Sequence, residues 1–126
     1  MRKQYHFRPS NSGFYAWDIS KLIEKTKQLA EINVGLHEIK ELDENWWYQG
    51  EEDIPSCRSI TEHVKIIKDA DLAYPIILSS DGRLMDGMHR ICKALLLGME
   101  TIRAVQFEED PIPDYQDIHP DDLPYD

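Results

Sequence analysis

The residues best suited to chemistry lie together in the run Asp86-Gly87-Met88-His89-Arg90. Apolar residues with helical i, i+3, i+4 spacing follow from Ile91 toward Gly98, which is typical of one buried helix face. His89 and Arg90 therefore fall in the first turn of that helix, beside unpaired backbone N–H groups and the positive end of the helix dipole. This arrangement favours an anion, most naturally a phosphate group.

The same turn also has a purely structural interpretation. Asp86 can serve as the helix N-cap, since its carboxylate can accept a backbone N–H of the first turn. In this interpretation Arg90 is a surface ion-pair partner and His89 is solvated. Positive side chains in a first turn are unfavourable by roughly 0.3–1 kcal/mol unless an anion receives them, which favours the binding interpretation only modestly. Both interpretations stay open at this point.

A β-hairpin is expected to position this turn. Residues 74–79 are typical of a short buried strand, Asp81-Gly82 of a two-residue turn, and residues 83–85 of a second strand. Gly87 lets the chain turn tightly between that strand and the helix, and Gly98 is the expected C-cap. The motif is thus predicted at a junction between a strand and a helix.

The other elements are predicted from spacing and capping residues. They are an irregular aromatic arm over residues 1–17, a helix over 19–31 capped by Asp18, a strand or extended segment over 33–42, a helix over 60–69 opened by the capping box Ser59-Ile60-Thr61-Glu62, and a half-buried strand over 101–107. His63 is expected at the surface, because no second ligand is spaced to join it. Trp46-Trp47-Tyr48 is expected to pack at the core and its rim.

The composition predicts one domain with an acidic C-terminal segment. A chain of 126 residues with 41% hydrophobic and 30% charged residues can bury a core without disulfides or metal. The net charge is −10, and residues 108–126 carry eight acidic side chains and no Lys or Arg. We therefore expect a domain over residues 1–107, followed by an acidic, proline-containing tail over 108–126 that is disordered.

The net charge and the cysteine content restrict the expected classes of partner and the expected cellular compartment. A sequence pI near 4.8 argues against direct DNA binding, which needs a basic face. The sequence has no long apolar run and no signal-peptide pattern, so we expect a cytoplasmic protein without membrane association. Cys57 and Cys92 lack Cys-x-x-Cys spacing and are expected to be buried, inert thiols. No group of side chains is predicted to form a metal site.

The order of these motifs resembles the ParB/sulfiredoxin superfamily. The resemblance is carried by Pro75-Ile76-Ile77-Leu78, Asp81-Gly82 and Asp86-Gly87-x-His89-Arg90, followed by a helix and a strand, and covers about residues 33–107. It implies an α+β fold of the ParB/sulfiredoxin type, with a small mixed sheet and helices near residues 19–31, 60–69 and 87–97. In that superfamily the helix N-terminus at the motif cradles the phosphates of a nucleotide.

Departures from the pattern separate the branches of this superfamily. Sulfiredoxins carry a catalytic Cys immediately before the His-Arg pair, where this chain has Met88, and a thioether cannot act as a thiolate nucleophile. ParB proteins have a motif closer to Gly-Glu-Arg-Arg and continue into a helix-turn-helix region, which the acidic residues after 107 do not resemble. Free-serine kinases are more similar, with Asp-Gly-His-His-Arg and an early His-Glu pair that corresponds to His37-Glu38.

The kinase resemblance implies roles for particular residues. Glu38 would accept the proton of an attacking hydroxyl group, and Asp86 would cap the helix or bind Mg²⁺. The opposing interpretation of Glu38, an exposed strand carboxylate, stays open. The nucleotide, which is ATP, ADP or CTP with Mg²⁺, would contact His37, Gly87, Met88, His89 and Arg90.

The expected function is a nucleotide-binding domain, with phosphoryl transfer to a small hydroxyl substrate as its candidate activity. The alternative is a non-catalytic nucleotide-sensing or protein-interaction module, in which the Trp46-Trp47 rim or the acidic tail contacts a protein partner or a second copy in a homodimer. A nuclease is a weaker third candidate, because the acidic surface and the lack of clustered metal-binding carboxylates speak against it.

Overall fold

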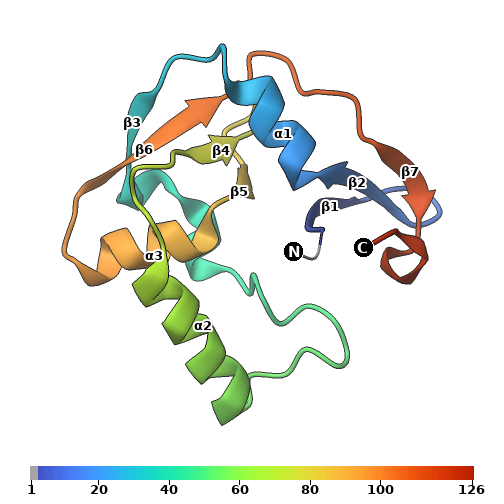
Figure 1. Ribbon diagram of the computed structural model, residues 1–126, viewed down its shortest axis with the longest axis horizontal. Coiled ribbons are helices and arrows are strands. Elements are labelled where there is room, and N and C mark those ends of the chain that lie inside the picture. Colours follow the sequence, from blue (N-terminus) through green and yellow to red (C-terminus); the bar gives the residue numbers. More distant parts are fainter. Residues whose placement is uncertain (1–2) are drawn as a thin grey trace.

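The computed structural model describes residues 3–126, which form two β-sheets and three α-helices (Figure 1). This confirms the predicted α+β class with a small mixed sheet. In chain order the elements are β1 (Tyr5–Pro9), β2 (Phe14–Asp18), α1 (Ile19–Thr26), β3 (Ile32–Gly35), α2 (Cys57–Asp69), β4 (Ile76–Leu78), β5 (Leu84–Asp86), α3 (Met88–Leu96), β6 (Thr101–Gln106) and β7 (Tyr115–Ile118), with short 3₁₀ turns η1 (Leu36–Glu38), η2 (Lys40–Asp43) and η3 (Pro120–Asp122).

The larger sheet positions the motif. Its strand order is β3-β6-β4-β5, with β4 parallel to β6 and the other neighbours antiparallel. β4 and β5 form the predicted hairpin, but its loop has three residues rather than two, because Ser79 N–H donates to Arg83 O (2.8 Å) and Gly82 completes the loop at φ +85°. β5 leads directly into α3, so residues 87–90 lie at one edge of this sheet.

Both faces of the larger sheet are covered. Ile76 of β4 packs in one apolar cluster with Ile91 of α3. Its neighbour Ile77 points to the opposite face and packs with Trp17 of β2 and Leu22 of α1. α3 therefore covers one face, and β2 with α1 covers the other, which explains why β4 is a continuous apolar run.

The N-terminal segment forms a hairpin rather than the predicted irregular arm. β1 and β2 pair antiparallel, with His6 opposite Trp17. Ser10 N–H donates to Gly13 O (2.9 Å) in the connecting loop, and a Cβ at Gly13 would lie 2.9 Å from Ile118 O of β7. The turn-forming residues that suggested an irregular arm thus belong to one tight loop. Residues 1–2 of the predicted arm lie outside the described residues.

The acidic C-terminal segment is part of the fold and not the disordered tail that its composition predicts. β7 pairs with β2 and completes the smaller sheet, whose order is β1-β2-β7. Trp17 Nε1–H donates to Pro111 O (2.9 Å), and Asp18 N–H donates to Asp114 Oδ2 (2.8 Å). These contacts satisfy polar groups on β2, so the segment contributes to the stability of the N-terminal hairpin.

We predict that shortening one buried side chain of this segment destabilises the whole protein. Leu123 is 5% exposed, so Leu123→Ala should leave a cavity and lower the free energy of unfolding by about 2 kcal/mol. Ile112→Ala is the matched control, because Ile112 is 77% exposed in the same segment and should cost less than about 0.5 kcal/mol. Urea denaturation followed by tryptophan fluorescence measures both. Equally small effects would contradict an ordered segment.

Several element boundaries differ from the predictions. Asp18 caps α1 as predicted, with its Oδ1 accepting from Ser20 N–H (2.9 Å), but α1 ends at Thr26. α2 begins three residues earlier than its predicted capping box, because Ser56 accepts from Ser59 N–H (3.1 Å). Residues 33–42 are a strand only as far as Gly35 and then form two 3₁₀ turns. Gly98 follows α3 at φ +74°, as expected of a C-cap glycine.

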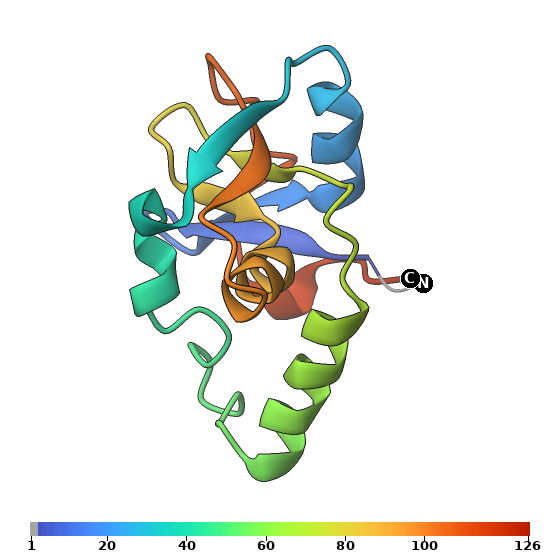
Figure 2. The ribbon, with the colours of Figure 1, turned by 90° about the vertical axis from the view of Figure 1, so that its left-hand side faces the viewer.

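α2 extends away from the body of the protein (Figure 2). None of its residues is buried, although the helix is amphipathic. Its C-terminal end is held by Lys93 of α3, whose Nζ donates to Lys68 O (2.9 Å) and Ala70 O (2.6 Å). Cys57 at its start is exposed, which corrects the prediction of a buried thiol. Among residues 3–126 no helix is long and apolar enough to cross a membrane.

Candidate functional site

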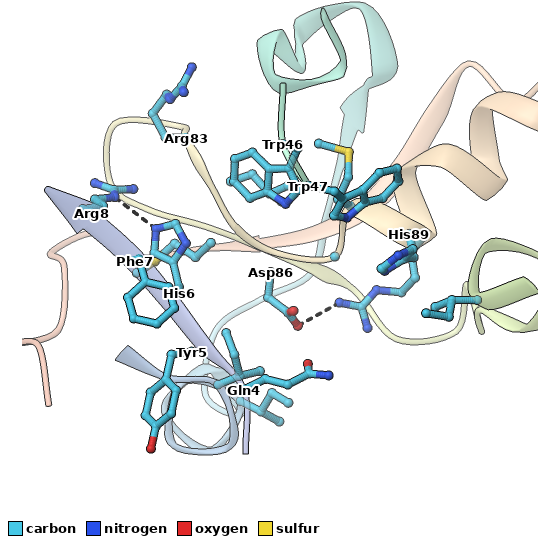
Figure 3. A pocket seen from close by; sticks show the side chains of 18 of the residues that line it. Gln4, Tyr5, His6, Phe7, Arg8, Trp46, Trp47, Arg83, Asp86 and His89 are labelled. Atoms are coloured by element: carbon cyan, nitrogen blue, oxygen red, sulfur yellow. Dashed lines mark hydrogen bonds and ion pairs between the residues drawn. The ribbon is translucent and has the colours of Figure 1, made fainter. Parts of the chain in front are cut away.

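A cleft of about 1210 Å³ lies where β1, the segment after η2, α2 and the junction of β5 with α3 meet (Figure 3). Its wall includes four of the chain's 14 basic residues and four of its 24 acidic residues. The charge of the lining is therefore balanced, while the protein as a whole carries −10. An anionic ligand meets less repulsion in this cleft than at the average surface of the protein.

The strand-to-helix junction takes a conformation that only glycine adopts readily. Gly87 lies at φ +118°, outside the regions open to other residues, and precedes the first turn of α3. Asp86, predicted as the N-cap, makes no cap; its Oδ2 instead accepts from Arg90 Nη2 (3.0 Å). With the cap position held by a glycine, the first-turn N–H groups of α3 receive no side-chain oxygen from residue 87.

Arg90 is held inside the cleft with most of its hydrogen-bonding capacity unused. Its side chain is 19% exposed, and in the described part of the chain only Asp86 pairs with it. Its Nε is fully buried and has no hydrogen-bond partner among the described residues. A guanidinium group has five N–H donors in a planar fork that suits phosphate and carboxylate. Arg90 can therefore receive an oxyanion without first losing a full set of protein partners.

The other arginines of the cleft are more completely paired. Arg83 donates from Nη1 and Nη2 to both carboxylate oxygens of Glu44 (2.9 and 2.8 Å), and its Nε lies 3.5 Å from the buried Glu41 carboxylate. These acids raise the pKa of Arg83 further above its usual range. Arg8 donates to His6 Nε2 (3.1 Å) and to Ser79 Oγ (2.8 Å). Arg90 is thus the least completely paired arginine of the cleft.

His89 packs in a stack of three rings rather than standing free in solvent. Trp47 lies over both His63 and His89, with ring centroids 4.2 and 4.7 Å away and interplanar angles of 19°. His63 Nδ1 and His89 Nε2 are 2.8 Å apart, so one of the two nitrogens carries the hydrogen and the other accepts it. Burial, with His63 and Arg90 close by, lowers the pKa of His89 to about 4. His89 is therefore uncharged at neutral pH, and Arg90 carries the positive charge of this turn.

The opposite wall contains a second neutral histidine that the sequence predictions missed. His6 of β1 is 8% exposed, and its Nε2 accepts a hydrogen bond from Arg8. Burial, together with Arg8, lowers the pKa of His6 to about 4. His6 and Arg8 are two residues apart and so share one face of the strand, a signal that becomes readable only once residues 5–9 are assigned as a strand.

The structure brings some predicted site residues together and separates others. Asp86, Gly87, Met88, His89 and Arg90 all line the cleft, and Met88 also packs in the apolar core. The His37-Glu38 pair is exposed, does not line the cleft, and belongs to η1, where Glu38 Oε2 accepts from Gly35 N–H (3.2 Å). The pair follows β3, whereas the motif follows β5, and these strands are the two opposite edges of the sheet.

The structure also differs from the predictions for His63 and for the Trp46-Trp47 pair. His63, expected as a surface residue without a partner, is half-buried and bonded to His89. Trp46 and Trp47 pack as predicted, but both also line the cleft. No group of three or more side chains among residues 3–126 is arranged to hold a metal ion.

Comparisons of the chain with protein-family models, with characterised proteins and with solved structures found no match, so the ParB/sulfiredoxin assignment stays a prediction.

Proposed function

We propose that the cleft binds a nucleotide, with its phosphate groups at the first turn of α3. The observation that carries this proposal is the state of Arg90, a largely buried guanidinium whose Nε has no partner among the described residues. Leaving such a donor unsatisfied costs about 1–3 kcal/mol. A phosphate that draws the guanidinium away from Asp86 would expose this donor and satisfy it. The adjoining first-turn N–H groups of α3, which no side chain caps, also favour an anionic ligand.

Phosphoryl transfer is the proposed activity of the bound nucleotide, and Asp86 is the carboxylate that would support it. Of the two carboxylates implied by the kinase resemblance, Asp86 lines the cleft and Glu38 does not. A phosphate that engages Arg90 would compete with Asp86 for the guanidinium. The Asp86 carboxylate would then be available to the Mg²⁺ that accompanies the nucleotide, or to the proton of a small hydroxyl acceptor.

We predict that nucleotide binding depends on Arg90. Thermal melts of the wild-type protein with ATP, ADP, CTP or GTP and Mg²⁺ should show stabilisation, of about 2.7 kcal/mol at a hundred times Kd. Arg90→Gln should weaken the affinity about 10- to 100-fold, since charged hydrogen bonds contribute about 1.5–3 kcal/mol. Arg103→Gln is the matched control, because Arg103 is a largely exposed arginine on β6 that does not line the cleft.

The outcomes separate the candidate functions. If no nucleotide stabilises the wild-type protein, or if both variants bind equally well, the proposed phosphate site is wrong. Binding followed by release of ADP in the presence of a hydroxyl acceptor, lost in Asp86→Asn, assigns phosphoryl transfer to the cleft. Binding without turnover for any acceptor assigns it to nucleotide sensing.

A further inference from the structure

The hydrogen-bonding state of His6 is fixed by its neighbour. Arg8 has only donor groups, so the His6 Nε2 that accepts from Arg8 Nε–H must be unprotonated. The ring is neutral and carries its hydrogen on Nδ1. Arg8 is in turn held by Ser79 Oγ and lies over the Trp17 ring, with Cζ 5.8 Å from its centroid. The tautomer of His6 is therefore set by packed neighbours before any ligand arrives.

The second nitrogen of His6 is directed toward the cleft. Figure 3 shows His6 projecting from β1, with Arg8 on one side of the ring and the other nitrogen on the side where Asp86 lies. Among the described residues no acceptor bonds to this Nδ1, and it is not one of the fully buried unsatisfied atoms. A rigid N–H donor therefore remains accessible within the cleft.

The surroundings of this donor are aromatic and electrically balanced. The ring of Trp46 lies nearly parallel to that of His6, at 17° and 6.4 Å between centroids, and Trp17 lies 5.6 Å from His6 on the neighbouring strand. The positive charge of Arg8 is offset by Asp81, whose carboxylate bonds the same Ser79 hydroxyl. This end of the cleft thus offers aromatic surface and a neutral donor, whereas the α3 end offers Arg90 and first-turn backbone N–H groups that no side chain caps.

We propose that the β1 end of the cleft binds a planar, uncharged group, the base of a nucleotide, against the aromatic wall of His6 and Trp46, with His6 Nδ1–H donating a hydrogen bond to an acceptor atom of that base. Oxygen and ring-nitrogen acceptors occur on the edges of all nucleobases, and a base stacks favourably on aromatic side chains. The inference rests on the proposed function, since it assigns the base to one end of the cleft and the phosphates to the other.

The test compares ATP with inorganic tripolyphosphate, each with Mg²⁺, by calorimetric titration of the full chain. Tripolyphosphate carries the phosphates without the base. His6→Leu should weaken ATP binding about tenfold or more and leave tripolyphosphate binding unchanged. His6→Asn should restore most of the ATP affinity, because its amide N–H replaces the donor at Nδ1. If the leucine variant does not fold, Trp46→Ala, which removes the other ring of the wall, makes the same distinction.

Each outcome decides between the two proposals. Failure of the wild-type protein to bind either compound rejects the nucleotide site, and the base site with it. Tripolyphosphate binding as tight as that of ATP keeps the phosphate site and overturns the base site. Equal weakening of both compounds in His6→Leu shows that His6 only supports the fold, and also overturns the base site. A selective loss for ATP, with rescue by asparagine, supports it.

Discussion

Gly87→Ala is expected to lower the free energy of unfolding by about 4 kcal/mol, which combines backbone strain with overpacking. The φ of +118° at Gly87 is strongly unfavourable for alanine. The new Cβ would also lie 2.6 Å from Ile76 Cγ2 and 2.9 Å from Arg90 Nη2. Ile76 is fully buried in the core and cannot move aside, so the strand-to-helix junction would have to shift. Arg90 would shift with it, and nucleotide affinity should fall.

Gly82→Ala separates the two contributions. Gly82 also has positive φ, at +85°, but a Cβ there would meet no atom within 4 Å. It should therefore cost only the strain of the left-handed conformation, about 1–2 kcal/mol. Urea denaturation of both variants gives the difference, which measures the clash at residue 87. Equal losses for the two glycines would show that the junction relaxes freely, contrary to this prediction.

Acidification from pH 7 to pH 5 is expected to destabilise the protein through its two neutral histidines. The pKa values of His6 and His89 are about 4 in the folded state, against 6.5 for an unperturbed histidine. Between these values the unfolded chain binds protons that the folded protein does not, so stability falls as the pH falls. The full shift corresponds to roughly 3 kcal/mol for His6, of which about 2 kcal/mol is lost by pH 5, and to less for His89, whose ring is only half-buried. Above pH 7 this dependence disappears.

The measurement is the free energy of unfolding in urea at several pH values between 7.5 and 5. His6→Asn and His89→Gln should each flatten the curve, and the double variant should remove most of it. The carboxylates with lowered pKa, Asp18, Glu44 and Asp81, release their stabilisation only as the pH falls toward 4 and below, so they do not mask the effect. An unchanged slope in the double variant would show that the histidines are not the cause.

The β4–β5 hairpin and α3 were predictable because the sequence patterns that specify them lie within these elements. The apolar spacing after Ile91 and the Asp81-Gly82 turn lie within one hairpin and one helix, and both elements form where they were predicted. The N-cap was assigned to Asp86 because carboxylates are frequent caps. The sequence alone does not show that Arg90, four residues later, competes for the same carboxylate.

The remainder of the cleft depends on long-range packing. β1 was missed because Pro9 and the residues up to Gly13 suggested an irregular arm, although Pro9 ends β1, opposite Phe14, and residues 10–13 form the turn between the two paired strands. Composition alone suggested disorder for the acidic segment, but Trp17 and the edge of β2 provide partners for it. The His37-Glu38 pair was predicted near the motif only by resemblance, and strand order places it at the far edge of the sheet.

The way in which α2 is attached predicts that this helix, which forms part of the cleft wall, detaches locally while the rest of the protein stays folded. No residue of α2 is buried, and directional contacts tie it to the body. These are the contact of His63 with His89 beneath Trp47, the hydrogen bond from Ser59 Oγ to Tyr48 OH, and the hydrogen bonds from Lys93 to its C-terminal end. Such a helix can detach without disrupting the apolar core, so its local free energy of opening lies well below the global value. A ligand touching both α2 and α3 would therefore raise this local free energy and order the wall as it binds.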